Sequence, residues 1–196
     1  YIPDMGPEGL NEFSRYFYPQ LDKEGLIIDD RANGGGNVSP MILERLSREP
    51  YRLTMRRGSA RIGTVPDAVQ VGPKVCLINK YSASDGDLFP WGFRALGLGK
   101  LIGTRTWGGI VGISGSLPYM DGTDIRVPFF TSFDPKTGSW IIENHGVDPD
   151  ILIDNDPVKE WNGEDQQLDR AIQEVMKELQ NRKPLPGVPT PRDFSK

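Results

Sequence analysis

The spacing of apolar residues along the chain changes repeatedly between the pattern of a buried strand and that of a helix. Short apolar runs within residues 25–29, 74–79 and 100–104 predict buried strands over these ranges. Helical spacing predicts one helix that begins near Pro7 and ends before Pro19, another after the glycines at 34–36, and a third from residue 84 onward. Strands that alternate with helices in this way are typical of an α/β layer architecture.

The rest of the chain carries weaker strand patterns and one strong helical pattern. Residues 51–57 alternate weakly, residues 115–130 predict a hairpin around Asp121-Gly122, and residues 139–143 predict a short strand. The final helix carries one continuous apolar stripe, which would form core or a subunit interface: Leu168, Ala171, Ile172, Val175, Met176 and Leu179. Repeated prolines after Asn181 exclude a helix there, so we expect one core domain over residues 1–182 and an extended or disordered tail over 183–196.

Composition narrows the possible partners and cofactors. The 196 residues are 37% hydrophobic and 26% charged, which suits a globular chain with one well-buried core. A net charge of −4 without a long basic run argues against nucleic acid or an anionic membrane as the main partner, and no apolar run is long enough to span a bilayer. The single cysteine, Cys76, lies in an apolar run and predicts a buried core residue. One cysteine and one histidine cannot form a Cys/His metal cluster, so we expect no metal and no cofactor.

Residues 82–87, Ser-Ala-Ser-Asp-Gly-Asp, carry the strongest candidate chemistry because they lie where a buried strand gives way to a helix. A serine there is next to unpaired backbone N–H groups that can stabilise an oxyanion. Only the residue at the helix start can bring its own Oγ and the next residue's N–H to one point, which favours Ser84 over Ser82 as a nucleophile. The alternative is that Ser84 only caps the helix, since Ser, Asp and Gly are common at helix starts.

A second glycine-rich turn follows the first predicted strand, at residues 34–36. It lacks both phosphate-binding signatures, since no Lys-Ser/Thr pair follows Gly36 and the spacing is not Gly-x-Gly-x-x-Gly. The turn is therefore either a simple tight turn or a place where a backbone N–H approaches a reacting carbonyl closely.

Taken together, these motifs resemble the tricorn protease family, whose members are serine peptidases related to the tail-specific (C-terminal-processing) proteases. The resemblance runs from Tyr1 to about Asn181 and rests on the segments 1–6, 25–37, 82–87, 97–109 and 143–150. It implies an α/β fold of the crotonase-like or ClpP-like spiral type, with a mainly parallel central sheet flanked by helices, plus a β-hairpin. The implied substrate is a peptide, and the implied state of the full-length protein is a homo-oligomer in the cytoplasm. A periplasmic or secreted location is the alternative if a signal peptide is missing.

The resemblance also assigns roles to individual residues. Ser84 matches the nucleophile, the Gly36 and Asp85 N–H groups match the oxyanion hole, and Glu143 matches a glutamate that assists by hydrogen bonding. The lysine base of tail-specific proteases is absent, because its place is taken by Gly109. Tricorn instead uses a histidine from a segment upstream of the region present here. We therefore expect an incomplete catalytic set and little activity in this chain alone.

Two questions stay open at this point. His145 is a candidate base within the chain, although a lone histidine near a strand end is usually a surface or capping group. In tricorn an acidic residue precedes the Arg-Arg-Gly that matches residues 56–58, but here residues 53–55 are Leu-Thr-Met, so basic and apolar side chains in the first pocket are both possible.

The alternative functions are a noncatalytic module that binds peptides or apolar ligands and, as a weaker option that leaves Ser84 unexplained, acyl-CoA chemistry.

Overall fold

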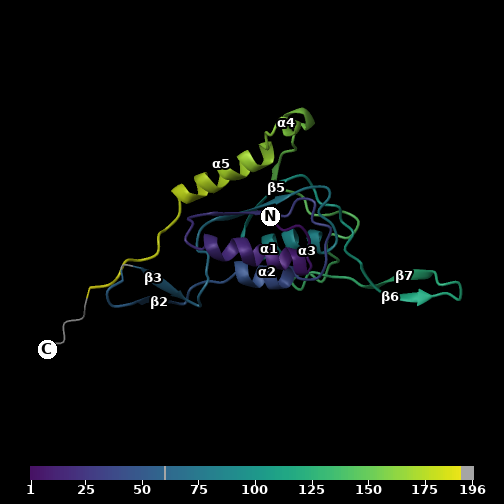
Figure 1. Ribbon diagram of the computed structural model, residues 1–196, viewed down its shortest axis with the longest axis horizontal. Helices are drawn as coiled ribbons and strands as arrows, with labels where there is room; N and C mark the ends of the chain where they lie inside the picture. The colour runs from purple at the N-terminus through teal and green to yellow at the C-terminus, as the bar shows by residue number, and fades with distance from the viewer. Residues whose placement is uncertain (60, 191–196) are drawn as a thin grey trace.

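A parallel sheet of four short strands forms the centre of the computed structural model, which describes residues 1–59 and 61–190 and, for 114–117, only the backbone (Figure 1). Its order is β1-β4-β5-β8, and every neighbouring pair is parallel. The strands are β1 (Leu26–Asp29), β4 (Lys74–Ile78), β5 (Gly99–Gly103) and β8 (Ile151–Leu152). The first three confirm the predicted strands, whereas β8 is too short to give a recognisable sequence pattern.

Helices cover both faces of this sheet, with α5 on one side and three helices on the other (Figure 1). The bounds are α1 (Pro7–Phe17), α2 (Ser39–Leu46), α3 (Asp85–Ala95) and α5 (Gln166–Gln180). A short 3-10 turn, η1 (Tyr18–Gln20), follows α1, which ends before Pro19 as predicted. The mixed α/β class with a parallel sheet flanked by helices is therefore confirmed.

The protein has two hydrophobic cores, one on each face of the sheet, because successive side chains of β4 point to opposite faces. Cys76 and Ile78 pack into the larger cluster, which includes Phe89 and Phe93 of α3, whereas other β4 residues pack against α5. Cys76 is fully buried, as its apolar surroundings predict, and burial raises the pKa of its thiol. It is thus an inert part of the core.

The apolar stripe of α5 is only partly core. Ala171 and Val175 are buried against the sheet, but Leu168, Ile172 and Met176 are 36%, 45% and 58% exposed. The stripe is wider than the surface that the sheet can cover, so the sequence pattern overstates how much of α5 is buried.

Two antiparallel ribbons project from the body on opposite sides (Figure 1). One pairs β2 (Arg52–Met55) with β3 (Ile62–Val65), and the other pairs β6 (Gly112–Pro118) with β7 (Asp124–Phe130). The second confirms the hairpin predicted around Asp121-Gly122.

The strand predicted at residues 139–143 is wrong. Only a single bridge joins Phe133 to Trp140, after which the backbone turns, with the His145 N–H donating to the Ile142 carbonyl at 3.1 Å. The short helix α4 (Pro157–Trp161) was not predicted, because five residues are too few for a helical period to show. Residues 183–190 of the predicted tail contain no helix or strand, and residues 191–196 lie outside the described residues.

The carboxyl ends of parallel strands meet at one edge of a sheet, and here they bring three loops together. The loop after β1 joins the loop after β4 through the Ala83 N–H, which donates to the Asn33 carbonyl at 2.8 Å. The loop after β5 joins the same place through the Trp107 N–H, which donates to the Ser82 carbonyl at 2.9 Å. These loops carry most of the candidate residues.

Candidate active site

Ser84 begins helix α3 in a backbone conformation that side chains rarely adopt, with φ 57° and ψ −120°. Such a conformation costs on the order of 1–3 kcal/mol and persists only where its surroundings enforce it. The side chain is half-buried, makes no capping bond, and its hydroxyl has no hydrogen-bond partner among the described residues. The capping alternative is therefore wrong. A sharp strand-to-helix turn that presents a free hydroxyl is also how α/β-hydrolases expose their nucleophilic serine.

Ser82, two residues earlier, has a structural role instead. It is fully buried, and its hydroxyl donates to the Asp30 carbonyl at 2.8 Å and accepts from the Asn79 N–H at 3.3 Å. Its hydroxyl is thus occupied, which separates it from Ser84 as the sequence argument anticipated.

The glycine turn lies directly against the serine turn. A Cβ added to Gly35 would be 2.6 Å from the Ser84 Cβ and 2.9 Å from the Asp85 nitrogen, and Gly35 has φ +99°. A Cβ on Gly36, with φ +150°, would be 1.9 Å from the Met5 carbonyl oxygen. Glycines are required here because the backbone passes closer to its neighbours than any side chain allows.

Two backbone N–H groups beside Ser84 are left without acceptors. Among the described residues, neither the Gly36 N–H nor the Asp85 N–H donates a hydrogen bond. Their neighbours are satisfied, since the Gly35 N–H donates to Asn33 Oδ1 at 3.0 Å and the Gly86 N–H donates to the Ala83 carbonyl at 2.8 Å. Unpaired donors close to a nucleophilic hydroxyl are what an oxyanion hole requires.

Two acidic residues near the serine turn, Asp30 and Asp87, are buried. Asp30 is fully buried, and neither of its carboxyl oxygens has a partner among the described residues; burial, with added repulsion from Asp29 and Asp87, raises its pKa well above the usual range. Asp87 is also buried and accepts from the Gly108 N–H at 2.7 Å. Burial raises the pKa of Asp87, while hydrogen bonds from Thr106 and Gly108 oppose the rise.

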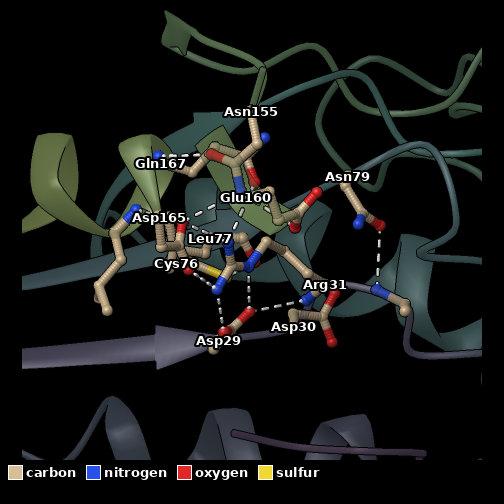
Figure 2. A network of polar contacts seen from close by, with 12 residues as sticks. Asp29, Asp30, Arg31, Cys76, Leu77, Asn79, Asn155, Glu160, Asp165 and Gln167 are labelled. Carbon is tan, nitrogen blue, oxygen red and sulfur yellow. Dashed lines mark hydrogen bonds and ion pairs between the residues drawn. The ribbon is translucent and has the colours of Figure 1, made fainter. Parts of the chain in front are cut away.

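On the other face of the sheet, Arg31 ties the start of the glycine turn to helix α5 (Figure 2). Its guanidinium donates to both carboxyl oxygens of Asp29, at 2.6 and 2.9 Å, and to both of Asp165, at 2.8 and 2.9 Å. Burial opposes the charge of Arg31, but these bonds raise its pKa overall. Burial by itself would raise the pKa of Asp165, but the hydrogen bonds from Arg31 and from the Leu168 N–H lower this pKa to about 2.

Glu143 and His145 lie on a different segment from the serine turn. Glu143 Oε2 accepts from the Ile110 N–H at 2.7 Å and from the Val111 N–H at 2.9 Å, and so fixes the loop after β5. His145 Nε2 lies 2.9 Å from Asp148 Oδ2, on the rim of a surface groove beside Trp91. No hydrogen bond joins either side chain to Ser84 within the described residues. Gly35, next to Gly36 in the glycine turn, thus lies against Ser84 and Asp85, whereas neither Glu143 nor His145 bonds directly to the serine within the described residues.

Comparison with known proteins places this geometry in a family. The model of peptidase family S41 matches residues 2–153. The chain belongs to peptidase family S41. It is 44% identical over 186 residues to the tricorn protease of Thermoplasma volcanium, covering 93% of this chain and 18% of the relative. It is also 38% identical over 172 residues to tricorn protease homolog 1 of Streptomyces coelicolor, covering 88% of this chain and 16% of the relative.

Solved structures agree with this assignment. The crystal structure of the tricorn protease superposes with a TM-score of 0.85 at 43% identity, over 92% of this chain and 17% of that one. The photosystem II D1 C-terminal processing protease, at 21% identity and a TM-score of 0.56 over 78% of this chain and 41% of that one, shares the fold. The tricorn resemblance is confirmed, and membership of S41 supports a serine peptidase function. The chain spans less than a fifth of the length of these tricorn relatives.

The part of the chain that the structure describes contains no group of three or more His, Cys, Asp or Glu side chains placed to hold a metal ion. No helix in residues 1–59 or 61–190 is long and apolar enough to cross a bilayer.

Sequence reasoning missed the residues that hold the site together. Asn33, Ser39 and the Asp87 side chain are all buried and each bonds to one of the loops around Ser84. Only Ser39 carried a local signal, because a serine followed by proline is a common helix start.

Proposed function

We propose that this chain is the nucleophile-bearing core of a serine peptidase that cleaves peptides by acyl transfer. One observation carries the proposal: the strained Ser84 lies against the glycine turn, and among the described residues its hydroxyl and the N–H groups of Gly36 and Asp85 have no hydrogen-bond partner. A serine that only capped the helix would accept from a backbone N–H of the first turn, and Ser84 makes no such bond.

In the proposed first step, the Ser84 oxygen bonds to the carbonyl carbon of the substrate while a base accepts the hydroxyl proton. The carbonyl oxygen takes up negative charge and receives hydrogen bonds from the Gly36 and Asp85 N–H groups, each worth about 3–4 kcal/mol in the transition state. The carbon–nitrogen bond then breaks, the base returns the proton to the leaving amine, and water hydrolyses the acyl-enzyme. The N-terminus of α3 adds a favourable dipole at the developing charge.

We infer that the base comes from outside the described residues, so the chain alone has little peptidase activity. Neither His145 nor Glu143 hydrogen-bonds to Ser84 within the described residues, and Glu143 already accepts from two backbone N–H groups, which supports this inference. Glu143 would then assist indirectly, by holding the loop at residues 110–111. The relatives are more than five times longer than this chain, which leaves ample sequence for a base and for assembly into a homo-oligomer.

Labelling with a serine-directed fluorophosphonate, followed by intact-mass analysis, tests the proposal. We would treat this chain and a version extended upstream to the length of the relatives, each with Ser84→Ala and with Ser82→Ala as the matched control. We expect labelling of the extended protein that Ser84→Ala abolishes, together with weak or no labelling of the short chain. The absence of Ser84-dependent labelling in both proteins would overturn the proposal and favour a noncatalytic binding module.

The residue preference of the first pocket is a separate question. The stretch that matches the acidic position of tricorn is Leu53-Thr54-Met55 on β2, where Met55 is 58% exposed. We propose that apolar side chains are accepted there at least as well as basic ones. A peptide library cleaved by the extended protein would decide, and a strict requirement for Lys or Arg would contradict this proposal.

A further inference from the structure

The two candidate oxyanion donors belong to different loops, so their separation depends on whatever fastens those loops together. Gly36 follows β1, while Asp85 follows β4. A donor that is misplaced by about 1 Å loses much of its effect on a transition state. The contacts between the loops therefore matter for rate as well as for stability.

The most direct fastening runs between Ser39 and the side chain of Asp85. The Ser39 N–H donates to Asp85 Oδ2 at 3.0 Å, and the Ser39 hydroxyl donates to Asp85 Oδ1 at 2.5 Å. Both residues are almost fully buried, at 3% and 5% exposure, so water competes little for these bonds. The pair joins the first residue of α2 to the first residue of α3.

Asp85 thereby acts at two helix ends. Its carboxylate caps α2, whose own preceding residue, Val38, provides no side-chain cap, and a negative charge at a helix N-terminus is favourable. Its backbone N–H remains free beside Ser84. Because Ser39 lies three residues after Gly36, the same pair restrains both donors.

Asn33 restrains the glycine turn from the other side. It is fully buried; its Oδ1 accepts from the Gly35 N–H at 3.0 Å, and its Nδ2 donates to the Ile2 carbonyl at 3.1 Å. Its own carbonyl accepts from Ala83 at 2.8 Å. The glycine turn is thus held by Asn33 before it and by Ser39 after it. Of these two residues, Ser39 is the one that bonds to Asp85 itself.

We propose that Ser39 is a positioning residue of the oxyanion hole, acting through the Asp85 carboxylate; this inference rests on the proposed function. The hydroxyl of Ser39 tethers the Asp85 side chain to the start of α2, which restrains the backbone of Asp85, and so its N–H, relative to Gly36. Loss of the Ser39 hydroxyl leaves the nucleophile and both oxyanion donors chemically intact but less well aligned. The expected consequence is a slower acylation step with unchanged substrate binding.

The test compares Ser39→Ala with the conservative Ser39→Thr and with Ser47→Ala in the upstream-extended protein. Ser47 is the matched control, because it follows the same helix and, among the described residues, its hydroxyl bonds only to the local Glu44 carbonyl. We expect Ser39→Ala to lower kcat about 10–100-fold with KM within about threefold, less than the 10²–10³-fold loss for removing a donor outright. Ser39→Thr, which keeps the hydroxyl, should recover most of the rate, and Ser47→Ala should match the unmodified protein.

A second readout separates alignment from folding. A peptide aldehyde forms an oxyanion when it adds to serine, so its inhibition constant should weaken in Ser39→Ala by the same factor as kcat/KM. Binding of the intact peptide substrate, measured in the Ser84→Ala background, should not change. Thermal unfolding of each variant shows whether the fold persists; should Ser39→Ala fail to fold, Asp85→Asn provides the second variant, because it keeps the backbone donor and exchanges a carboxyl oxygen for an amide.

The outcomes distinguish this inference from the proposed function. Unchanged kcat in a folded Ser39→Ala, or a loss that appears in KM and in substrate binding, would overturn the positioning role while Ser84-dependent turnover stands. Turnover that survives Ser84→Ala would instead overturn the proposed function.

Discussion

The buried carboxyl group of Asp30 predicts that this protein loses stability as the pH rises, and that Asp30→Asn removes the loss. Both carboxyl oxygens of Asp30 lack partners among the described residues, and burial raises its pKa well above the value of about 4 expected in an unfolded chain. Between those two pKa values the folded state holds a proton that the unfolded state releases. The free energy of unfolding therefore falls with rising pH in that window and is unaffected by Asp30 below it.

The size of the effect follows from proton linkage. Each pH unit within the window costs up to about 1.4 kcal/mol, so the stability difference between the two proteins widens as the pH rises toward the folded-state pKa of Asp30 and is constant above it. In a chain of this size, each kcal/mol of that difference raises the melting temperature of Asp30→Asn by about 2–4 °C relative to the unmodified protein. Asparagine keeps the shape and neutral polarity of a protonated carboxyl, so the two proteins should be almost equally stable near pH 4.

Urea unfolding at several pH values between 4 and 7.5, followed by tryptophan fluorescence, measures this difference directly. Asp22→Asn, which removes an exposed carboxylate, is the matched control and should leave the pH dependence close to that of the unmodified protein. Parallel curves for Asp30→Asn and the unmodified protein, or a less stable Asp30→Asn at pH 7, would show that Asp30 is not held neutral by burial and would refute the reasoning.

Further substitutions test other contacts of the site. Gly35→Ala should abolish fluorophosphonate labelling of the extended protein, because a Cβ there would lie 2.6 Å from the Ser84 Cβ, whereas Gly34→Ala, with open space around its Cβ, should label normally. Asp165→Asn should lower stability by about 2 kcal/mol at pH 7, because the pKa of Asp165 is about 2 in the folded state, and chemical denaturation should show this deficit disappearing as the pH falls from about 4 toward 2. Asp169→Asn, on the exposed side of α5, serves as its control, and an Asp165→Asn deficit that persists at pH 2 would contradict a role for the ion pair with Arg31. Glu143→Ala should speed hydrogen exchange at the Ile110 and Val111 amides, Glu143→Gln should largely prevent this, and unchanged exchange in Glu143→Ala would exclude the holding role.

The sequence predicted elements well where one physical signal dominated. The buried strands β1, β4 and β5 and the helix α5 have unbroken apolar patterns, and each was found. The segment 139–143 has similar apolar residues, but its backbone bonds locally in a turn, which no period reveals. The elements β8 and α4 are too short to show any period.

The candidate site also has one part that local sequence predicts and another part that it does not. Ser84 and the glycine turn follow from local sequence, since a serine at a strand-to-helix junction and three successive glycines after a buried strand are both visible in neighbouring residues. The contacts that hold the loops together do not follow from local sequence, because Ser39 and Asp85 are 46 residues apart and meet only once the sheet has formed. Asp30 is similar: nothing in its neighbours along the chain indicates a carboxyl group that is completely enclosed.

The backbone of Ser84 also bears on how this chain has been shaped by selection. A φ of 57° with ψ −120° is a conformation that glycine adopts at much lower cost than serine, so a glycine here would make the fold more stable. Most proteins stay only slightly above the stability that they need, and a lineage with no use for the hydroxyl would gain by exchanging it. Under the proposed function, the strain at Ser84 is the stability that this protein gives up to present its nucleophile.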